Sequence, residues 1–293
     1  MRMNPQVRSF YDSATSTFTH LVYDQDGGRC AIVDPVLDYD SAQARTQTTS
    51  ADRVLAFADQ HALRVNWILE THAHADHLTA AAYLKRKTGA RVAIGHGITR
   101  VQERFKALFG LEREFATDGR QFDRLFADGE TFAIGQLQAR AIATPGHTDD
   151  SLTYLIGDAA FVGDTVFAPE TGTARADFPS GDARKLYRSI HTLFDLPRDT
   201  RLFLCHDYPS TGRQAHALSS LEDQAQRNVH IGGGIDEAAF VKMRTERDAT
   251  LAAPRLILPS LQVNIRAGEL PPPCANGIRY LRLPLNQLGV DAS

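Results

Sequence analysis

The sequence has no long apolar stretch, and no hydrophobic run approaches the roughly 18 residues that a helix needs to span a bilayer. Residues 1–10 are polar, include two arginines and lack an apolar core, so we expect no secretory signal. Lys and Arg form no long run, and the formal net charge is −3. This charge gives no electrostatic basis for binding nucleic acid or an anionic membrane surface.

Cysteine is also scarce. The three cysteines, Cys30, Cys205 and Cys274, are odd in number and far apart, which excludes a disulfide framework and a CxxC zinc knuckle. A reducing cytoplasm is therefore the expected compartment. Hydrophobic residues make up 43% and charged residues 23% of the 293 positions, which is enough for a full globular core.

Short apolar runs alternate with stretches of helical periodicity. The predicted strands are 18–23 and 30–33, which form a hairpin, and 65–69, 92–94, 131–134, 137–143, 151–156, 159–162 and 202–205. The predicted helices are 50–62 with Ser50 as its cap, 78–87 followed by Gly89, 98–109 and 183–194. Two successive strand–helix–strand halves indicate an α/β fold with two sheets face to face and helices outside, an αββα sandwich.

The composition changes after residue 211. We expect residues 1–211 to form the catalytic domain and residues 212–293 a C-terminal extension packed on it. The extension has two predicted helices, a break at Gly232–Gly234 and an extended run over 256–265, before three prolines at 271–273.

The segment Thr71–His77, with the sequence THAHADH, follows a predicted buried strand and carries His72, His74, Asp76 and His77. Imidazole and carboxylate groups are ligands for zinc, iron or manganese, and the alanine spacers let the loop fold tightly. Ligands in α/β proteins collect beyond the carboxyl ends of strands, where this loop lies. The alternative is a histidine-rich surface turn.

Three further strand ends carry matching groups: His147 in TPGHT, Asp164 in GDT and His206 in CHD. Taken singly, a Gly-Asp after a strand is usually a turn, and a His before Asp is often a hydrogen-bonded surface residue. Each of these groups follows an apolar run and can reach the same sheet edge, and Gly146 and Gly163 permit tight turns there. Together the four elements predict one metal site.

This order of motifs resembles the metallo-β-lactamase superfamily over residues 18–208. The resemblance implies one metal position formed by His72, His74 and His147. It implies a second position formed by Asp76, His77 and His206, with Asp164 able to bridge. Two zinc ions about 3.5–4 Å apart would activate a water that hydrolyses an ester, thioester or phosphodiester, as in glyoxalase II.

Other segments resemble the persulfide dioxygenases of the same superfamily. These are Glu70-Thr71-His72, the run GTARADFP at 172–179 and CHDY at 205–208. The run 257–273 is similar to a longer, bacterial branch of that group, although Cys274 stands where an acidic residue is expected.

The dioxygenase resemblance implies one Fe(II) per chain, held by the catalytic residues His72, His147 and Asp164. Such a two-histidine, one-carboxylate triad leaves three coordination positions open. It implies glutathione persulfide and O₂ as substrates and sulfite and glutathione as products. His74, Asp76, His77 and His206 would then orient the ligands and hold water, whereas a hydrolase would use them as direct ligands.

Arg175 and Tyr208 are the candidate substrate-binding residues. The Arg175 guanidinium either faces the glutathione pocket or pairs with Asp177, and the Tyr208 hydroxyl either reaches the pocket or packs at its edge. Asn228 is expected to border the cleft. Cys205 is expected to be a small buried residue rather than a nucleophile. A homodimer is compatible with the sequence.

Overall fold

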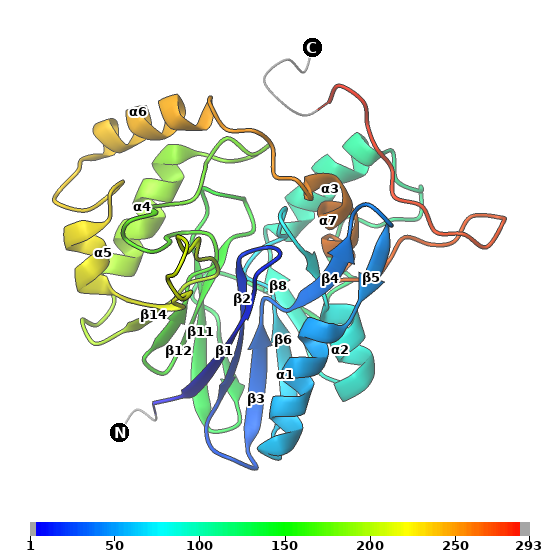
Figure 1. Cartoon of the computed structure of the whole chain (residues 1–293), viewed down its shortest axis with the longest axis horizontal. Coiled ribbons are helices and arrows are strands. Elements are labelled where there is room, and N and C mark those ends of the chain that lie inside the picture. The colour runs from blue at the N-terminus through cyan, green and yellow to red at the C-terminus, as the bar shows by residue number, and fades with distance from the viewer. Residues whose placement is uncertain (1–3, 288–293) are drawn as a thin grey trace.

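Two six-stranded sheets face each other in the computed structural model, which describes residues 4–287 (Figure 1). The first sheet has the order β1 (Gln6–Asp12), β2 (Thr17–Tyr23), β3 (Arg29–Val33), β6 (Arg64–Leu69), β8 (Arg91–Gly95) and β9 (Arg124–Phe126). The second has the order β10 (Thr131–Ile134), β11 (Leu137–Ala143), β12 (Leu152–Ile156), β13 (Ala159–Phe161), β14 (Arg201–Phe203) and β15 (Leu218–Ser220). A small third sheet joins β5 (Arg45–Gln47), β4 (Val36–Asp40) and β7 (Leu78–Thr79).

Helices cover the outer faces of both sheets. Against the first sheet lie α1 (Thr49–Gln60), α2 (Ala81–Thr88), α3 (Ile98–Phe109) and α7 (Ile257–Asn264). Against the second lie α4 (Ala183–Phe194), α5 (Leu221–Arg227) and α6 (Glu237–Asp248). The predicted αββα sandwich is confirmed.

The apolar layer between the sheets joins residues such as Val33, Leu69, Tyr154 and Phe161, all of them buried. Each fully buried aliphatic side chain contributes about 1.5–3 kcal/mol to the stability of the folded chain. This layer fixes the two sheets to each other, and therefore fixes the loops at their shared edge.

Parallel pairing brings the carboxyl ends of several strands to one edge. Strand β6 is parallel to β3 in the first sheet, and β14 is parallel to β13 in the second. Asp34 follows β3, the histidine-rich loop follows β6, Asp164 follows β13 and His206 follows β14. The fold thus places the histidine-rich loop, Asp164 and His206 together, as the sequence predicted, and adds Asp34 to them.

Several predicted elements have the observed bounds, among them 98–109, 137–143 and 183–194. The hairpin is confirmed as the antiparallel pair β2–β3, and Gly89 ends α2 with a φ of 71°. Helix α1 begins after Thr48, so the prediction of Ser50 as its cap is wrong. The Ser50 hydroxyl instead donates to Asp38 at 2.7 Å.

The predicted helix over 78–87 is also wrong at its start. Leu78 and Thr79 form β7, which pairs with β4, and the helix begins at Ala81. The reason is tertiary, since the backbone N–H of Thr79 donates to Asn264 and its hydroxyl donates to Glu70.

The run over 256–265 is helix α7 rather than an extended segment. Six of its eight residues are buried, so no polar face marks a helical period, and a short apolar run of this kind does not distinguish helix from strand. Two other helices and β15 also follow residue 211, and β15 pairs with β14 in the second sheet. The domain boundary at 211 stays a prediction.

Within residues 4–287, no helix combines the length and the apolar character that a bilayer crossing requires.

Candidate metal centre

Three buried side chains converge at the edge shared by the two sheets. His72 Nε2 lies 3.9 Å and His147 Nε2 lies 3.6 Å from Asp164 Oδ2. Their ligand-type atoms all lie within 4.8 Å of one another. Two atoms that are each about 2.1 Å from one ion must lie within about 4.2 Å of each other, so these spacings suit shared coordination of a cation.

Neighbouring groups fix the orientation of both imidazoles. His147 Nδ1 lies 2.7 Å from the carbonyl oxygen of Arg175 and donates to it, which leaves the lone pair on Nε2. His72 Nδ1 lies 3.1 Å from the hydroxyl of Thr71, so its Nε2 also points inward.

Buried polar atoms without partners mark the centre. Among the described residues, His72 Nε2 and His77 Nε2 are buried and make no hydrogen bond. Orphaned buried polar atoms are costly and therefore need an explanation. A bound metal ion would complete their coordination, so this donor set fits the metal that the sequence predicted.

A second group of ligand-type residues adjoins Asp164. His206 Nε2 lies 3.2 Å from Asp164 Oδ1 and 3.3 Å from Asp76 Oδ2, and His77 Nδ1 lies 3.6 Å from that same Asp76 oxygen. Burial opposes protonation of His206, but the carboxylates of Asp164 and Asp76 outweigh it and raise the His206 pKa to about 10. The two carboxylates therefore stabilise positive charge at this position.

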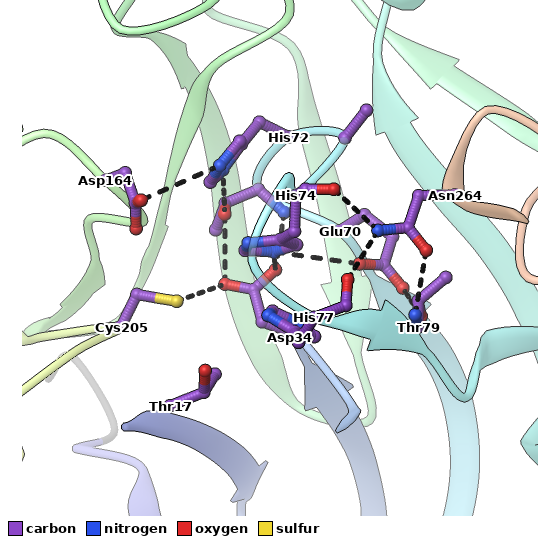
Figure 2. A network of polar contacts seen from close by, with 12 residues as sticks. Thr17, Asp34, Glu70, His72, His74, His77, Thr79, Asp164, Cys205 and Asn264 are labelled. Carbon is purple, nitrogen blue, oxygen red and sulfur yellow. Dashed lines mark hydrogen bonds and ion pairs between the residues drawn. The ribbon is translucent and has the colours of Figure 1, made fainter. Parts of the chain in front are cut away.

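His74 contacts a different carboxylate. Its Nε2 lies 3.0 Å from Asp34 Oδ1 (Figure 2). Asp34 also accepts from the backbone N–H of Thr71 at 2.8 Å. Burial opposes a charge on His74, but Asp34 outweighs it and raises the His74 pKa to about 9. A His74 ring nitrogen also lies within 4.8 Å of ligand-type atoms of Asp164 and His206, so the ring borders the centre as well.

A cavity of about 500 Å³ opens beside the metal centre. Its metal-side wall includes Asp76, His147 and Asp164, and its other walls include Phe167, Thr173, Arg175, Tyr208, His230, Arg244 and Arg247. Arg175 pairs with Asp177 and Arg244 pairs with Asp248, whereas Arg247 makes no ion pair within the described part of the chain. The Arg247 guanidinium therefore suits an anionic group on a molecule whose reactive end faces the metal centre.

The two predicted substrate-binding residues both line this cavity. The predicted pairing of Arg175 with Asp177 is present, since Arg175 Nε donates to Asp177 at 2.6 Å. The Arg175 side chain also forms part of the wall, and its role in substrate binding stays a prediction. Tyr208 is 52% exposed, and its ring stacks against His206 with a centroid separation of 6.1 Å. Asn228 lies behind the cavity wall, where it is buried and donates to the Gly172 carbonyl at 3.0 Å.

Cys205 is buried next to His206, and burial raises its thiol pKa well above the ordinary value. A buried thiol that resists ionisation is a poor nucleophile. Its surroundings agree with the interpretation of Cys205 as a packing residue.

Sequence reasoning missed the groups that hold the run 172–179 in place. Arg244 is buried, pairs with Asp248 and donates to the Thr173 carbonyl at 3.1 Å. Asp248 accepts from the N–H of Ala176 at 2.8 Å, and His230 Nδ1 accepts from the N–H of Thr173 at 2.9 Å. No local pattern distinguishes these residues, because their partners lie 57 to 72 positions away. Asp34 had a usable signal, since it follows a strand as Asp164 does.

The environment of His230 predicts a pH-dependent stability. Burial and, next, the neighbouring Arg244 lower the His230 pKa from 6.5 to about 4. The unfolded chain therefore binds this proton at a higher pH than the folded chain, so stability is fully present above pH 6.5 and is lost as the pH falls toward 4. We expect His230 to account for about 2 kcal/mol of the stability lost between about pH 7 and 5.

Urea unfolding at both pH values measures this loss in the wild type and in His230→Gln. The variant should show the shallower dependence, while His191→Gln, which removes an exposed histidine, should keep the wild-type slope. Equal slopes in all three proteins would refute the assignment.

Comparison with known proteins identifies the family of this chain. The profile described as the metallo-beta-lactamase superfamily matches residues 14–206. The chain belongs to this superfamily. The match ends at His206, the last of the seven predicted ligand-type residues, so it includes the whole metal centre.

Relatives within the superfamily carry different names. A "probable metallo-hydrolase" of Burkholderia pseudomallei is 52% identical over 96% of this chain and 99% of its own length. "Glyoxylase B2" of Dictyostelium discoideum is 47% identical over 98% of this chain and 99% of its own length. A "beta-lactamase hydrolase-like protein" of Xylella fastidiosa is 50% identical over 97% of this chain, which spans only 65% of that protein.

Persulfide dioxygenases are also among the relatives. The human mitochondrial persulfide dioxygenase ETHE1 is 27% identical over 91% of this chain and 90% of its own length. The crystal structure of ETHE1 from Myxococcus xanthus is 30% identical, with a TM-score of 0.71 over 90% of this chain and all of that one. The predicted resemblance to this group is confirmed.

Proposed function

We propose that this chain is a non-haem iron dioxygenase that oxidises glutathione persulfide with O₂ to sulfite and glutathione in the cytoplasm. The observation that carries the proposal is the buried His72–His147–Asp164 cluster at the end of a cavity whose walls include Arg175 and Arg247. The similarity to the ETHE1 proteins supports it independently.

In this proposal His72, His147 and Asp164 hold one Fe(II), and His74, Asp76, His77 and His206 surround it. Iron in such a triad supplies O₂ activation and open positions for the persulfide sulfur. Both oxygen atoms of O₂ pass to the terminal sulfur, water supplies the third oxygen of sulfite, and the S–S bond breaks to release glutathione as its thiol.

The cavity walls would bind the glutathione moiety. Arg175 and Tyr208 lie beside the metal centre, and the His230 ring is fixed because its Nδ1 accepts from Thr173. Its other nitrogen then carries the proton and is a hydrogen-bond donor. Arg247 makes no ion pair within the described part of the chain and would attract a glutathione carboxylate.

A role of Arg247 in binding predicts a selective change in KM. Arg247→Ala should raise KM for glutathione persulfide about tenfold, equivalent to roughly 1.4 kcal/mol, with kcat nearly unchanged. Lys242→Ala removes an exposed cation from the same helix outside the cavity and serves as the matched control. Initial rates over a range of persulfide concentrations measure both constants, and an unchanged KM in Arg247→Ala would contradict the role.

A thioester hydrolase with two zinc ions is the second candidate. It is favoured by the names of relatives at 47% and 52% identity and by the four further ligand-type residues around the triad. In that reaction Asp76, His77 and His206 would bind a second metal, and the cavity would hold a glutathione thioester.

Parallel assays distinguish the two reactions. Protein purified without added metal is given glutathione persulfide in an oxygen-electrode cell and, separately, S-lactoylglutathione with thiol detection. The proposal predicts rapid oxygen uptake with the persulfide and little thioester cleavage. Thioester cleavage without any persulfide-dependent oxygen uptake would establish the hydrolase instead.

A further inference from the structure

Asn264, the last residue of α7, contacts the histidine-rich loop that follows β6 (Figure 2). Its Nδ2 donates to the carbonyl oxygens of His74 and His77, each at 2.8 Å. Its Oδ1 accepts from the backbone N–H of Thr79 at 2.8 Å. The buried amide thus uses both donors and its acceptor on one six-residue stretch of backbone.

The first half of the same loop, residues 71–73, is also held by side chains. Asp34 accepts from the N–H of Thr71, and Asp150 accepts from the N–H of Ala73 at 2.8 Å. The hydroxyl of Thr79 donates to buried Glu70 at 2.5 Å. Side chains from three separate parts of the sequence therefore satisfy the backbone of this loop, and Asn264 holds its second half together with the β4–β7 pairing.

Helix α7 is itself anchored in the core. Leu261, Val263 and Ile265 are buried with the residues that cover the first sheet. A side chain on a well-packed helix has little freedom, so its hydrogen bonds define the position of the groups it contacts. Asn264 lies 187 positions from His77 in the sequence, so the sequence alone gave no sign of this link.

We propose that Asn264 is a positioning residue for the metal centre, through which α7 sets the backbone that presents His72, His74, Asp76 and His77. Groups outside the coordination sphere that orient metal ligands typically change metal affinity by about 10–100-fold. The inference rests only on the metal-binding part of the proposed function. It does not depend on which metal is native or which reaction occurs.

The isosteric variant Asn264→Asp tests the proposal. A carboxylate can still accept from Thr79, but it cannot donate to the His74 and His77 carbonyls, which then face an acceptor. Gln262→Glu is the matched control, because Gln262 is a buried amide on the same helix. Gln262 donates to the Leu258 and Arg282 carbonyls, at 2.8 and 2.9 Å, and within the described residues it makes no hydrogen bond to the metal loop.

Metal-free proteins are titrated anaerobically with Co²⁺ against a competing chelator, and the visible ligand-field spectrum is recorded. Asn264→Asp should bind Co²⁺ at least about tenfold more weakly and with an altered spectrum. Gln262→Glu should remain within about twofold of the wild type even if both variants lose similar thermal stability. Wild-type affinity and spectrum in folded Asn264→Asp would overturn the proposal.

A measurement on the wild type keeps the proposal testable if Asn264→Asp does not fold. Coupling between two sites is reciprocal, so Co²⁺ binding should slow amide hydrogen exchange in α7 as well as in the loop 71–80. Protection of the loop with no change in α7 would refute the link. Neither measurement involves turnover, so failure of the dioxygenase assay and failure of this inference are distinguishable.

Discussion

His72→Ala should abolish metal retention and reduce persulfide oxidation by at least about a thousandfold. The His72 ring is buried with its Nε2 directed toward Asp164, so the substitution removes one of the three ligands of the proposed triad. Removing one of three ligands leaves a two-ligand site that loses its ion during purification. Metal analysis and oxygen uptake of protein expressed in iron-supplemented medium measure both effects.

His206→Ala is the informative comparison for this experiment. His206 contacts Asp164 and Asp76 but lies outside the proposed triad, so most of the iron should remain bound. We expect its metal affinity to fall by no more than roughly 10–100-fold, as for other groups that orient ligands. Equal loss of metal in both variants would contradict the mononuclear site and favour two metals.

Gly146→Ala should destabilise the protein by roughly 3 kcal/mol or more and lower Tm by about 6 °C or more. Gly146 has a φ of +137°, and a Cβ there would lie 2.2 Å from the backbone nitrogen and 2.4 Å from the Cα of Leu186. The contact is with the backbone of α4, which cannot move aside as a flexible side chain does. Thermal unfolding monitored by circular dichroism measures the change.

Gly129→Ala separates backbone conformation from crowding. Gly129 has a φ of +75°, but a Cβ there meets nothing within 4 Å. We expect it to cost about 1 kcal/mol, the conformational penalty alone. Because Gly146 precedes His147, its substitution should also reduce metal occupancy, whereas Gly129→Ala should not. Similar effects of the two substitutions on stability and metal content would refute this account.

The metal centre was predictable because its ligands follow strand ends. Short apolar runs ending in THAHADH, GH, GD and CH each carry a local signal, and sheet geometry brings such ends to one edge. The amphipathic helices α3 and α4 were also predicted with their observed bounds, because their buried and exposed residues alternate with a helical period that is visible in the local sequence.

The remaining features depend on contacts between distant residues. Helix α7 is buried on nearly all sides and therefore lacks a helical pattern, and β7 forms because Thr79 is bound by Asn264 and Glu70. The cavity walls contributed by His230, Arg244 and Arg247 come from the segment after residue 211. Their roles appear only when that segment is packed against the run 172–179.

The glycine at the start of the run 172–179 also has a physical explanation. Gly172 has a φ of +97°, and a Cβ there would lie 2.1 Å from His230 Nδ1. The backbone can therefore approach the His230 ring only without a side chain at this position. The run 172–179 lies where the loop, the cavity wall and the His147 partner Arg175 meet.

The central claim is that one iron ion held by His72, His147 and Asp164 couples O₂ to persulfide sulfur. The most direct test is the ratio of O₂ consumed to sulfite formed by protein that retains its native metal, with the metal content determined on the same sample. We predict one O₂ per sulfite and about one iron per chain. Two tightly bound zinc ions, with no oxygen uptake on glutathione persulfide, would contradict the account.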